Sequence, residues 1–408
     1  MFKKFLKNTG PGPFIAAAFI GPGTVTVCTL AGVAYGFQLL WAIMISIVAA
    51  IALQGMAVRI GVLGQKSIIT ALHEALPTPW IKKAMLILIF SAIMIGNTAY
   101  EAGNISGAAL GLETVFGLSD FYLLTYKFKL YPLLIGLIIA GLLWLGKYKI
   151  LECILIFLVL LMSLAFLFTA IATGPDLLGV IKGLVTFSVP KGSLLSIISL
   201  VGTTIVPYNL FLHTELVREK WSQKTALPKA LTDMVLALGL GGVISLSIII
   251  TAAGIEANEL RNAADLALGL APIFGDGAKY LLSLGLFSAG ITSSITAPLA
   301  AAYVVCGCLG WNTDLKAPHF QRIWAVVVLI GVLFASTGIT FIQIIQFAQI
   351  ANGILLPIIA GILVWIMNKA SWLGDNKNNL IQNLFGLIIV LLSLILSIRS
   401  LAAVFQFI

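Results

Sequence analysis

The chain has 408 residues, of which 60% are hydrophobic and only 10% are charged, and its mean hydropathy is +1.09. A soluble domain of this length could not carry so much apolar surface in water. The formal net charge of +9 could indicate a nucleic-acid partner, but the basic residues lie in short loops between apolar segments. Because that distribution is typical of membrane proteins, the composition predicts an integral membrane protein and argues against nucleic acid as a partner.

The apolar segments predict an all-α protein with eleven transmembrane helices, since about 20 apolar residues cross the hydrocarbon of a bilayer. The expected helices cover residues 13–34, 39–63, 84–112, 131–145, 150–172, 194–217, 231–253, 275–307, 323–336, 341–367 and 380–404. If the N-terminus is inside, 17 of the 24 Lys and Arg residues fall on the cytoplasmic side. By the positive-inside rule we expect a cytoplasmic N-terminus and an external C-terminus, in the plasma membrane of a prokaryote.

Two of these segments contain a proline where a membrane helix should be continuous. The sequence Gly-Pro-Gly-Thr occupies residues 21–24 of the first segment, and Val-Pro-Tyr-Asn occupies residues 206–209 of the sixth. Proline has no N–H and its ring clashes with the carbonyl four residues earlier, so both sequences predict a break in the helix. The simpler alternative is a proline kink that binds nothing.

The two predicted breaks lie five segments apart, so the two interrupted helices run in opposite directions. This arrangement is typical of transporters built from two inverted repeats, with the substrate site at the broken helices. We therefore expect a LeuT-like fold in a single transmembrane domain, 1–408. Its repeats would cover about 13–173 and 194–367, with an additional helix at about 380–404.

Broken helices free backbone carbonyl and N–H groups, which can then bind an ion or a polar solute. Thr24 and Asn209 add neutral side-chain oxygens beside the breaks, and Gln349 needs a polar partner within its apolar segment. Tyr208 offers a hydroxyl, although a packing aromatic with one hydrogen bond explains it almost as well. The expected substrate-binding residues are Gly21, Thr24, Thr203, Val206, Tyr208, Asn209 and Gln349.

Glu101 lies in the middle of the third apolar segment, one turn after Asn97. A carboxylate at this depth is costly and indicates a functional site, unless a structural ion pair or hydrogen bond within the helix bundle accounts for it. His213 and Glu215 follow the second break and indicate either an ion pathway to the cytoplasm or interfacial residues. The expected coupling or ion-pathway residues are Asn97, Glu101, His213 and Glu215, and the expected metal ligands are Thr24, Asn209 and Glu101.

Two further patterns bear on function. The eighth segment carries Ser288, Thr292, Ser293, Ser294 and Thr296, which indicate close helix packing or, alternatively, a secondary ion site. The chain has only three histidines, and they lie on different segments, so no nucleophile–base set or metal cluster is predicted. We therefore expect neither a catalytic site nor a cofactor.

Four stretches together resemble the NRAMP family of divalent-metal transporters through segments one to ten. They are residues 10–14 leading into 21–24, residues 206–213, residues 285–299 with an Ala-Gly-x-x-Ser-Ser-x-Thr core, and residues 349–357. The resemblance implies a transporter of a divalent metal. Asn209, His213 and Gln349 match the family's pattern.

The chain departs from that pattern at the expected ligands. The family's first break is typically Asp-Pro-Gly-Asn, where Asp and Asn bind the metal, and here Gly21 and Thr24 stand in their places. The second break is typically Met-Pro-His-Asn, and here Val206 and Tyr208 replace the Met and the His. Since sulfur ligands favour softer metals, their loss leaves neutral oxygens suited to harder cations.

The family's proton-handling acids of the third segment align near Asn97 and Tyr100, or near Glu101 with a shift of one residue. Since the Asp of the first break is also absent, the sequence does not predict proton coupling. We expect a monomeric transporter of a small cation, a divalent metal of the Mg or Mn class, that works by alternating access. Two alternatives remain open: a carrier of a small polar organic solute, and an NRAMP-like protein that has lost metal transport.

Overall fold

The computed structural model describes residues 11–76, 78–117, 120–123, 126–146, 149–255, 263–337 and 339–406. Gly10, the first residue of the stretch that resembles the NRAMP family, lies outside them.

Helices make up most of the described chain. The first half contains α2 (Gly12–Phe19), α3 (Pro22–Tyr35), η1 (Gly36–Leu39), α4 (Leu40–Gly64), α5 (Ile68–Ala75), α6 (Pro79–Phe116), α7 (Leu130–Leu145), α8 (Lys149–Ala172) and α9 (Leu177–Val185). The second half contains α10 (Leu194–Thr204), α11 (Pro207–Lys220), η2 (Lys224–Ala226), α12 (Leu227–Ala252), η3 (Ala263–Leu270), α13 (Ala271–Phe274), α14 (Gly277–Leu309), α15 (Pro318–Ser336), α16 (Phe341–Lys369), η4 (Ser371–Asn376) and α17 (Leu380–Gln406).

One short hairpin departs from the expected all-helical chain. Strands β1 (Asp120–Leu123) and β2 (Tyr126–Lys129) pair antiparallel, with Asp120 opposite Lys129. The hairpin lies between α6 and α7, in a connection that contains polar and aromatic residues rather than a continuous apolar run.

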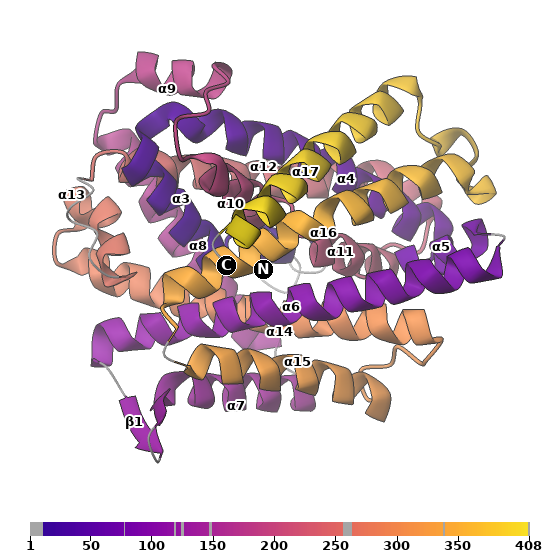
Figure 1. The fold of residues 1–408 in the computed structure, drawn as a ribbon, viewed down its shortest axis with the longest axis horizontal. Coiled ribbons are helices and arrows are strands. Elements are labelled where there is room, and N and C mark those ends of the chain that lie inside the picture. Colours follow the sequence, from indigo (N-terminus) through magenta and orange to yellow (C-terminus); the bar gives the residue numbers. More distant parts are fainter. Residues whose placement is uncertain are drawn as a thin grey trace.

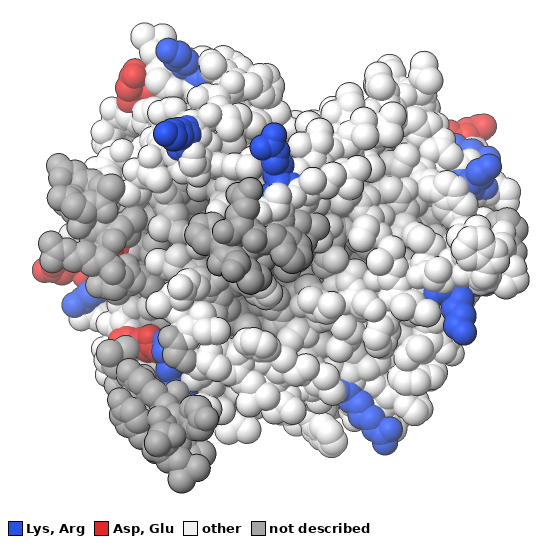
Figure 2. Space-filling model, in the orientation of Figure 1, with Lys and Arg blue, Asp and Glu red and all other residues white. Residues whose placement is uncertain are grey.

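Eight helical segments within the described residues are long and apolar enough to cross a membrane, or nine if α8 and α9, which meet at a bend of 118°, count as one span. Many large apolar side chains on these helices are exposed, as the hydrocarbon of a bilayer requires. In Figure 2 most of the coloured Lys, Arg, Asp and Glu residues lie towards the left and right, and most of the described surface between them is white. The protein is therefore an integral membrane protein.

Both prolines of the two special sequences stand at the first position of a helix. Helix α2 ends at Phe19 and α3 begins at Pro22, and the linking Gly21 is extended at φ −86° and ψ 176°. Helix α10 ends at Thr204 and α11 begins at Pro207, after an extended Val206. Proline suits a first helical position because the N–H that it lacks would have no partner there.

Ten of the helices form two groups, which meet beside the two breaks. Helices α6, α7, α14 and α15 lie side by side along the lower part of Figure 1, and α6 packs closely on α14. Glycines permit that contact, because a Cβ on Gly290 of α14 would lie 2.6 Å from the carbonyl oxygen of Asn104 on α6. Helices α2, α3, α4, α10, α11 and α12 form the second group. We call the first group the scaffold and the second the bundle.

Candidate functional site

The two broken helices meet directly through a pair of threonines. The hydroxyl of Thr24 donates to the carbonyl oxygen of Phe19 at 2.8 Å, which is one of the carbonyls exposed by the first break. The hydroxyl oxygens of Thr24 and Thr203 lie 3.0 Å apart. Because Thr24 has already given its only hydroxyl hydrogen to Phe19, Thr203 is the donor in this pair. The site is therefore built across both breaks.

Gln349 closes a third side of the site from α16. A Cβ on Gly23 would lie 2.3 Å from Nε2 of Gln349, and a Cβ on Gly202 would lie 2.3 Å from its carbonyl oxygen. Glycine is required at position 202 because the neighbouring atoms belong to the backbone of α16, whereas at position 23 the neighbouring atom is the end of the Gln349 side chain. Both side-chain atoms of Gln349, Nε2 and Oε1, are buried without a hydrogen-bond partner among the described residues.

Gly21 faces Ser293 of α14, which lies in the scaffold. A Cβ on Gly21 would lie 3.3 Å from Oγ of Ser293, and that Oγ is itself buried without a partner. The backbone of Gly21 is extended, with φ of −86°, so any residue could adopt it. The backbone conformation therefore does not require glycine here. The effect of glycine at this position is that no side chain points into the site.

Tyr208 and Tyr100 form an aromatic pair between the bundle and the scaffold. Their ring centroids are 5.3 Å apart and the rings stand edge-on at 71°. Tyr208 is buried and its hydroxyl has no hydrogen-bond partner among the described residues. The neighbouring Asn209 and Val206 are also buried, and Oδ1 of Asn209 is likewise unpartnered.

Five of the buried polar side-chain atoms without a partner among the described residues lie beside the two breaks. Leaving a buried donor or acceptor without a partner costs about 1–3 kcal/mol, and native proteins contain few such groups. The affected atoms beside the breaks are Oη of Tyr208, Oδ1 of Asn209, Oγ of Ser293, and Nε2 and Oε1 of Gln349. Such a cluster is expected where a polar ligand or solvent binds, because the ligand or solvent would then form hydrogen bonds with these atoms.

Glu101 lies on α6 and is fully buried. Its Cγ packs against α15, where a Cβ on Gly331 would lie 2.6 Å away. Ser294 and Asn104 neighbour the carboxylate, but neither carboxylate oxygen forms a hydrogen bond of good geometry within the described part of the chain. The structural ion pair that we considered for Glu101 is therefore not found there, and the carboxylate lies within the scaffold, near α14 and α15.

Asn97 has a structural partner. Its Nδ2 donates to the carbonyl oxygen of Ala297 at 2.8 Å, next to Pro298, which interrupts the hydrogen bonding of α14. Asn97 therefore ties α6 to the irregular part of α14, one turn before Glu101.

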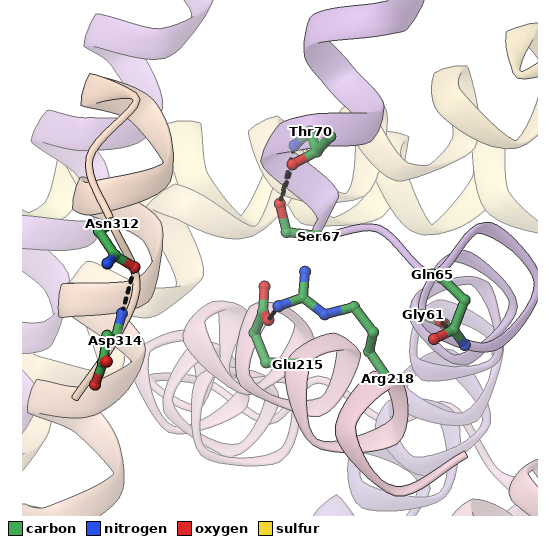
Figure 3. Close-up of polar contacts among 8 residues, drawn as sticks. All are labelled: Gly61, Gln65, Ser67, Thr70, Glu215, Arg218, Asn312 and Asp314. Atoms are coloured by element: carbon green, nitrogen blue, oxygen red, sulfur yellow. Dashed lines mark hydrogen bonds and ion pairs between the residues drawn. The ribbon is translucent and has the colours of Figure 1, made fainter. Parts of the chain in front are cut away.

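His213 and Glu215 follow the second break along α11. Nδ1 of His213 lies 2.6 Å from Oε1 of Gln54 on α4, and its Nε2 is buried without a partner among the described residues. Glu215 pairs with Arg218 one turn later, at 2.5 Å. Figure 3 shows this pair below Ser67, with Asn312 and Asp314 on its left and Gln65 on its right in that view. This imidazole and this carboxylate thus lie on α11 beyond the break.

The predicted residues fall into three sets. Gly21, Thr24, Thr203 and Gln349 come together at the breaks, and Tyr208, Asn209 and Val206 are buried on the first turn of α11. Glu101 and Asn97 face other scaffold helices. His213 and Glu215 lie further along α11.

Three residues outside the predicted set also take part. Ser293 faces Gly21, Tyr100 packs on Tyr208, and Gln54 holds His213. The sequence could have indicated Gln54 as a functional residue, because an amide in an apolar segment needs a polar partner. Ser293 belongs to the hydroxyl-rich segment for which we left an ion site open, and only the packing of α14 on the break distinguishes it from its neighbours.

The donor set differs from that of a metal site rich in charged ligands. No group of three or more His, Cys, Asp or Glu residues able to hold a metal ion occurs in the part of the chain that the structure describes. Hydroxyl, amide and backbone oxygens remain as ligands, and these suit hard cations such as Mg²⁺, Ca²⁺ and Mn²⁺.

Known proteins resemble this chain along almost its whole length. Curated relatives include the divalent metal cation transporter MntH of Verminephrobacter eiseniae, 24% identical with 91% of this chain and 84% of that protein covered. The MntH of Staphylococcus haemolyticus is 26% identical, with 95% of this chain and 90% of that protein covered. Both names describe transporters rather than enzymes.

Solved structures share the fold. A manganese transporter of Eremococcus coleocola, in complex with an aromatic bis-isothiourea compound, superposes with a TM-score of 0.77 at 19% identity and covers 98% of this chain and 87% of that one. MhsT in complex with L-phenylalanine gives a TM-score of 0.57 at 16% identity, covering 97% and 98% of the two chains. Residues 12–403 match the family described as natural resistance-associated macrophage protein-like, and the chain therefore belongs to the Nramp family of transporters.

Proposed function

We propose that this protein transports a divalent cation of the Mg or Mn class across the plasma membrane by alternating access. The observation that carries the proposal is the cluster of unpartnered neutral oxygens where the two broken helices meet. Membership of the Nramp family and the names of the MntH relatives support a divalent metal as the substrate.

The neutral donor set points to a hard cation that keeps part of its water shell. Thr24, Asn209 and Gln349 can offer oxygens, but none of these groups carries a charge to offset a bare divalent ion. Mg²⁺ sheds water reluctantly and usually keeps several waters when bound. Glu101 could compensate the ion's charge from the scaffold side, and we assign it that role together with the ligands Thr24 and Asn209.

The arrangement of the helices supports alternating access. We infer eleven crossings, in which α2 with α3 and α10 with α11 are the two broken spans. The repeats of about 13–173 and 194–367 are inverted relative to each other, and α17 is the additional helix. The bundle carries Thr24, Thr203 and Asn209, whereas the scaffold carries Glu101 and Ser293. Movement of one group relative to the other would open the site to either side in turn. All these residues come from one chain, which suits a transporter that works as a monomer.

His213 and Glu215 extend this site towards the end of α11. In our proposal they line the path by which the ion reaches the cytoplasm, with Asn97 supporting the irregular turn of α14 opposite. Gly21 in place of an acid removes a proton carrier from the site, so we do not propose coupling to protons.

The test is uptake into proteoliposomes of Mn²⁺, Mg²⁺ and Ca²⁺, with a pH-sensitive dye enclosed. We expect at least one of these ions to enter without acidification. Asn209→Ala should lower the affinity for that ion about tenfold, because a ligand oxygen worth about 1.5 kcal/mol is lost. Asn368→Ala, at an exposed amide near the end of α16, is the matched control.

A second candidate, a carrier of a small polar organic solute, rests on the aromatic pair of Tyr100 and Tyr208 beside hydrogen-bonding Thr and Gln side chains. The candidate is supported by the shared fold of MhsT, whose structure is described in complex with L-phenylalanine. If a correctly folded protein admits none of the three ions, the metal proposal fails and this candidate replaces it. Binding of neither ions nor amino acids would instead indicate a family member that has lost transport.

A further inference from the structure

A crevice separate from the two breaks lies between α4, α12 and α17. It has a volume of about 630 Å³ and is closed at one end by η4 and the chain that follows it. Clefts that hold small molecules commonly measure about 300–1,000 Å³. Figure 1 shows α17, in yellow, crossing this region before it runs alongside α16.

The walls of the crevice are apolar and open to the surroundings of the protein. Ile51, Leu231 and Met234 line one side and Phe385 lines the other. Ile381, at the rim, is 76% exposed. Since these helices cross the membrane, the open side faces hydrocarbon rather than water.

The closed end of the crevice is polar and carries Arg59. Its guanidinium donates to the carbonyl oxygens of Gly55 and Asn376 and to the side-chain oxygens of Gln382 and Asn378, at 2.8–3.4 Å. All four acceptors are neutral, and no ion pair of Arg59 occurs within the described residues. A guanidinium has five N–H hydrogens, so one hydrogen remains after these four bonds.

The charges around this end favour an anion. Lys377 and Asp375 also line the crevice, so Arg59, Lys377 and Asp375 together leave one positive charge in excess. A cation at the edge of the hydrocarbon without a counter-charge is unfavourable. The remaining N–H of the Arg59 guanidinium can donate one charge-assisted hydrogen bond to a phosphate oxygen.

We propose that this crevice binds one anionic phospholipid, with the headgroup phosphate at Arg59 and an acyl chain along the apolar walls. The lysines and arginines of the chain place this end of α4 on the cytoplasmic side. Anionic lipids concentrate in that leaflet, and basic pockets between membrane helices on that side bind such headgroups. The lipid would complete the packing of α17 against α4 and α12.

The test is native mass spectrometry of the purified protein incubated with equal amounts of phosphatidylglycerol and phosphatidylcholine. We expect one phosphatidylglycerol to be retained about tenfold more than phosphatidylcholine, because both lipids carry a phosphate but phosphatidylcholine also brings a choline cation to an end with excess positive charge. Arg59→Gln should abolish this preference. Arg322→Gln removes the same charge from an exposed position at the start of α15 and should leave the preference unchanged.

A second variant keeps the test decisive if Arg59→Gln fails to fold. Ala52→Phe fills the apolar part of the crevice and leaves the hydrogen bonds of Arg59 in place, so it should lower retention of phosphatidylglycerol about tenfold. Equal retention of the two lipids by the wild type would overturn the proposal. So would unchanged retention in Ala52→Phe, or full competition by glycerol 3-phosphate, which would indicate a site for free phosphate esters.

Discussion

Gly21 is the residue at which this chain differs most in chemistry from the pattern of its family. Its backbone is extended and its missing side chain would face Oγ of Ser293. A carboxylate placed there would lie among neutral oxygens and add the charge that a divalent ion otherwise lacks. The extended backbone at position 21 would therefore accept an aspartate.

We predict that Gly21→Asp raises the affinity for Mn²⁺ by about tenfold or more, because one carboxylate in a partly desolvated site contributes at least about 1.4 kcal/mol. Isothermal titration calorimetry would measure the change. Gly21→Asn has nearly the same size without the charge and is the control. Equal affinities of the two variants would mean that the residue at position 21 does not face the ion.

At the scale of single residues, sequence reasoning identified most of the groups at the breaks but not their partners. Thr24 and Thr203 stood out because each follows or precedes a proline in an apolar segment. Their mutual hydrogen bond joins residues 179 positions apart, and no local pattern could indicate it. The same holds for Tyr100 and Tyr208, whose contact depends on how α6 packs on α11.

At the scale of helices, the defect that Pro357 causes in α16 is repaired by a neighbouring helix. Pro357 cannot donate to the carbonyl oxygen of Gly353 on α16, and Oγ of Ser397 on α17 donates to that oxygen at 2.8 Å instead. This hydrogen bond is one of the polar contacts that hold α17 to the rest of the protein.

Ser397→Ala should therefore lower the free energy of unfolding by about 1–2 kcal/mol, because the buried carbonyl of Gly353 loses its partner. Thermal unfolding in detergent would detect the loss as a lower Tm. Ser393→Ala is a matched control, since the Ser393 hydroxyl bonds only within its own helix. Equal Tm values for both variants would show that the contact with α16 contributes nothing.

The contact between α3 and α6 joins the bundle to the scaffold and leaves no room for a side chain. A Cβ on Gly107 would lie 2.3 Å from Cβ of Pro22, directly beside the first break. Gly107→Val should force these helices apart, at a cost of about 1–3 kcal/mol. We expect the initial rate of ion uptake to fall about tenfold.

Gly141→Val on α7 is the control for that experiment, because a Cβ at Gly141 meets no atom within 4 Å. It should leave uptake unchanged. Wild-type uptake in Gly107→Val would contradict the idea that α3 and α6 must close against each other during transport.

At the scale of the whole molecule, the direction of insertion is a prediction from charge alone. Lys316 and Lys191 are both exposed, and the positive-inside count assigns them to opposite sides of the membrane. In a variant without the four native cysteines, Lys191→Cys should react with an impermeant maleimide on intact cells. Lys316→Cys should react only after permeabilisation, and the reverse result would invert the topology.

The sequence by itself determined that this is a helical membrane protein and where its helices break. Apolar runs must be helical in hydrocarbon because every backbone group needs a partner within its own segment, so the predicted range 341–367 lies within α16. Proline lacks the N–H that continues a helix, so Pro22 and Pro207 begin new ones. These constraints are local and can be read from a few neighbouring residues.

The tertiary structure decided which polar groups meet. Glycines at positions 23 and 202 let α3 and α10 approach α16, which brings Gln349 to the breaks. Gly331 likewise leaves room on α15 for the side chain of Glu101. The crevice at Arg59 likewise exists only because α17 crosses α4 and α12. Side-chain partners across helices depend on packing geometry, for which hydrophobicity and helix breaks carry no information.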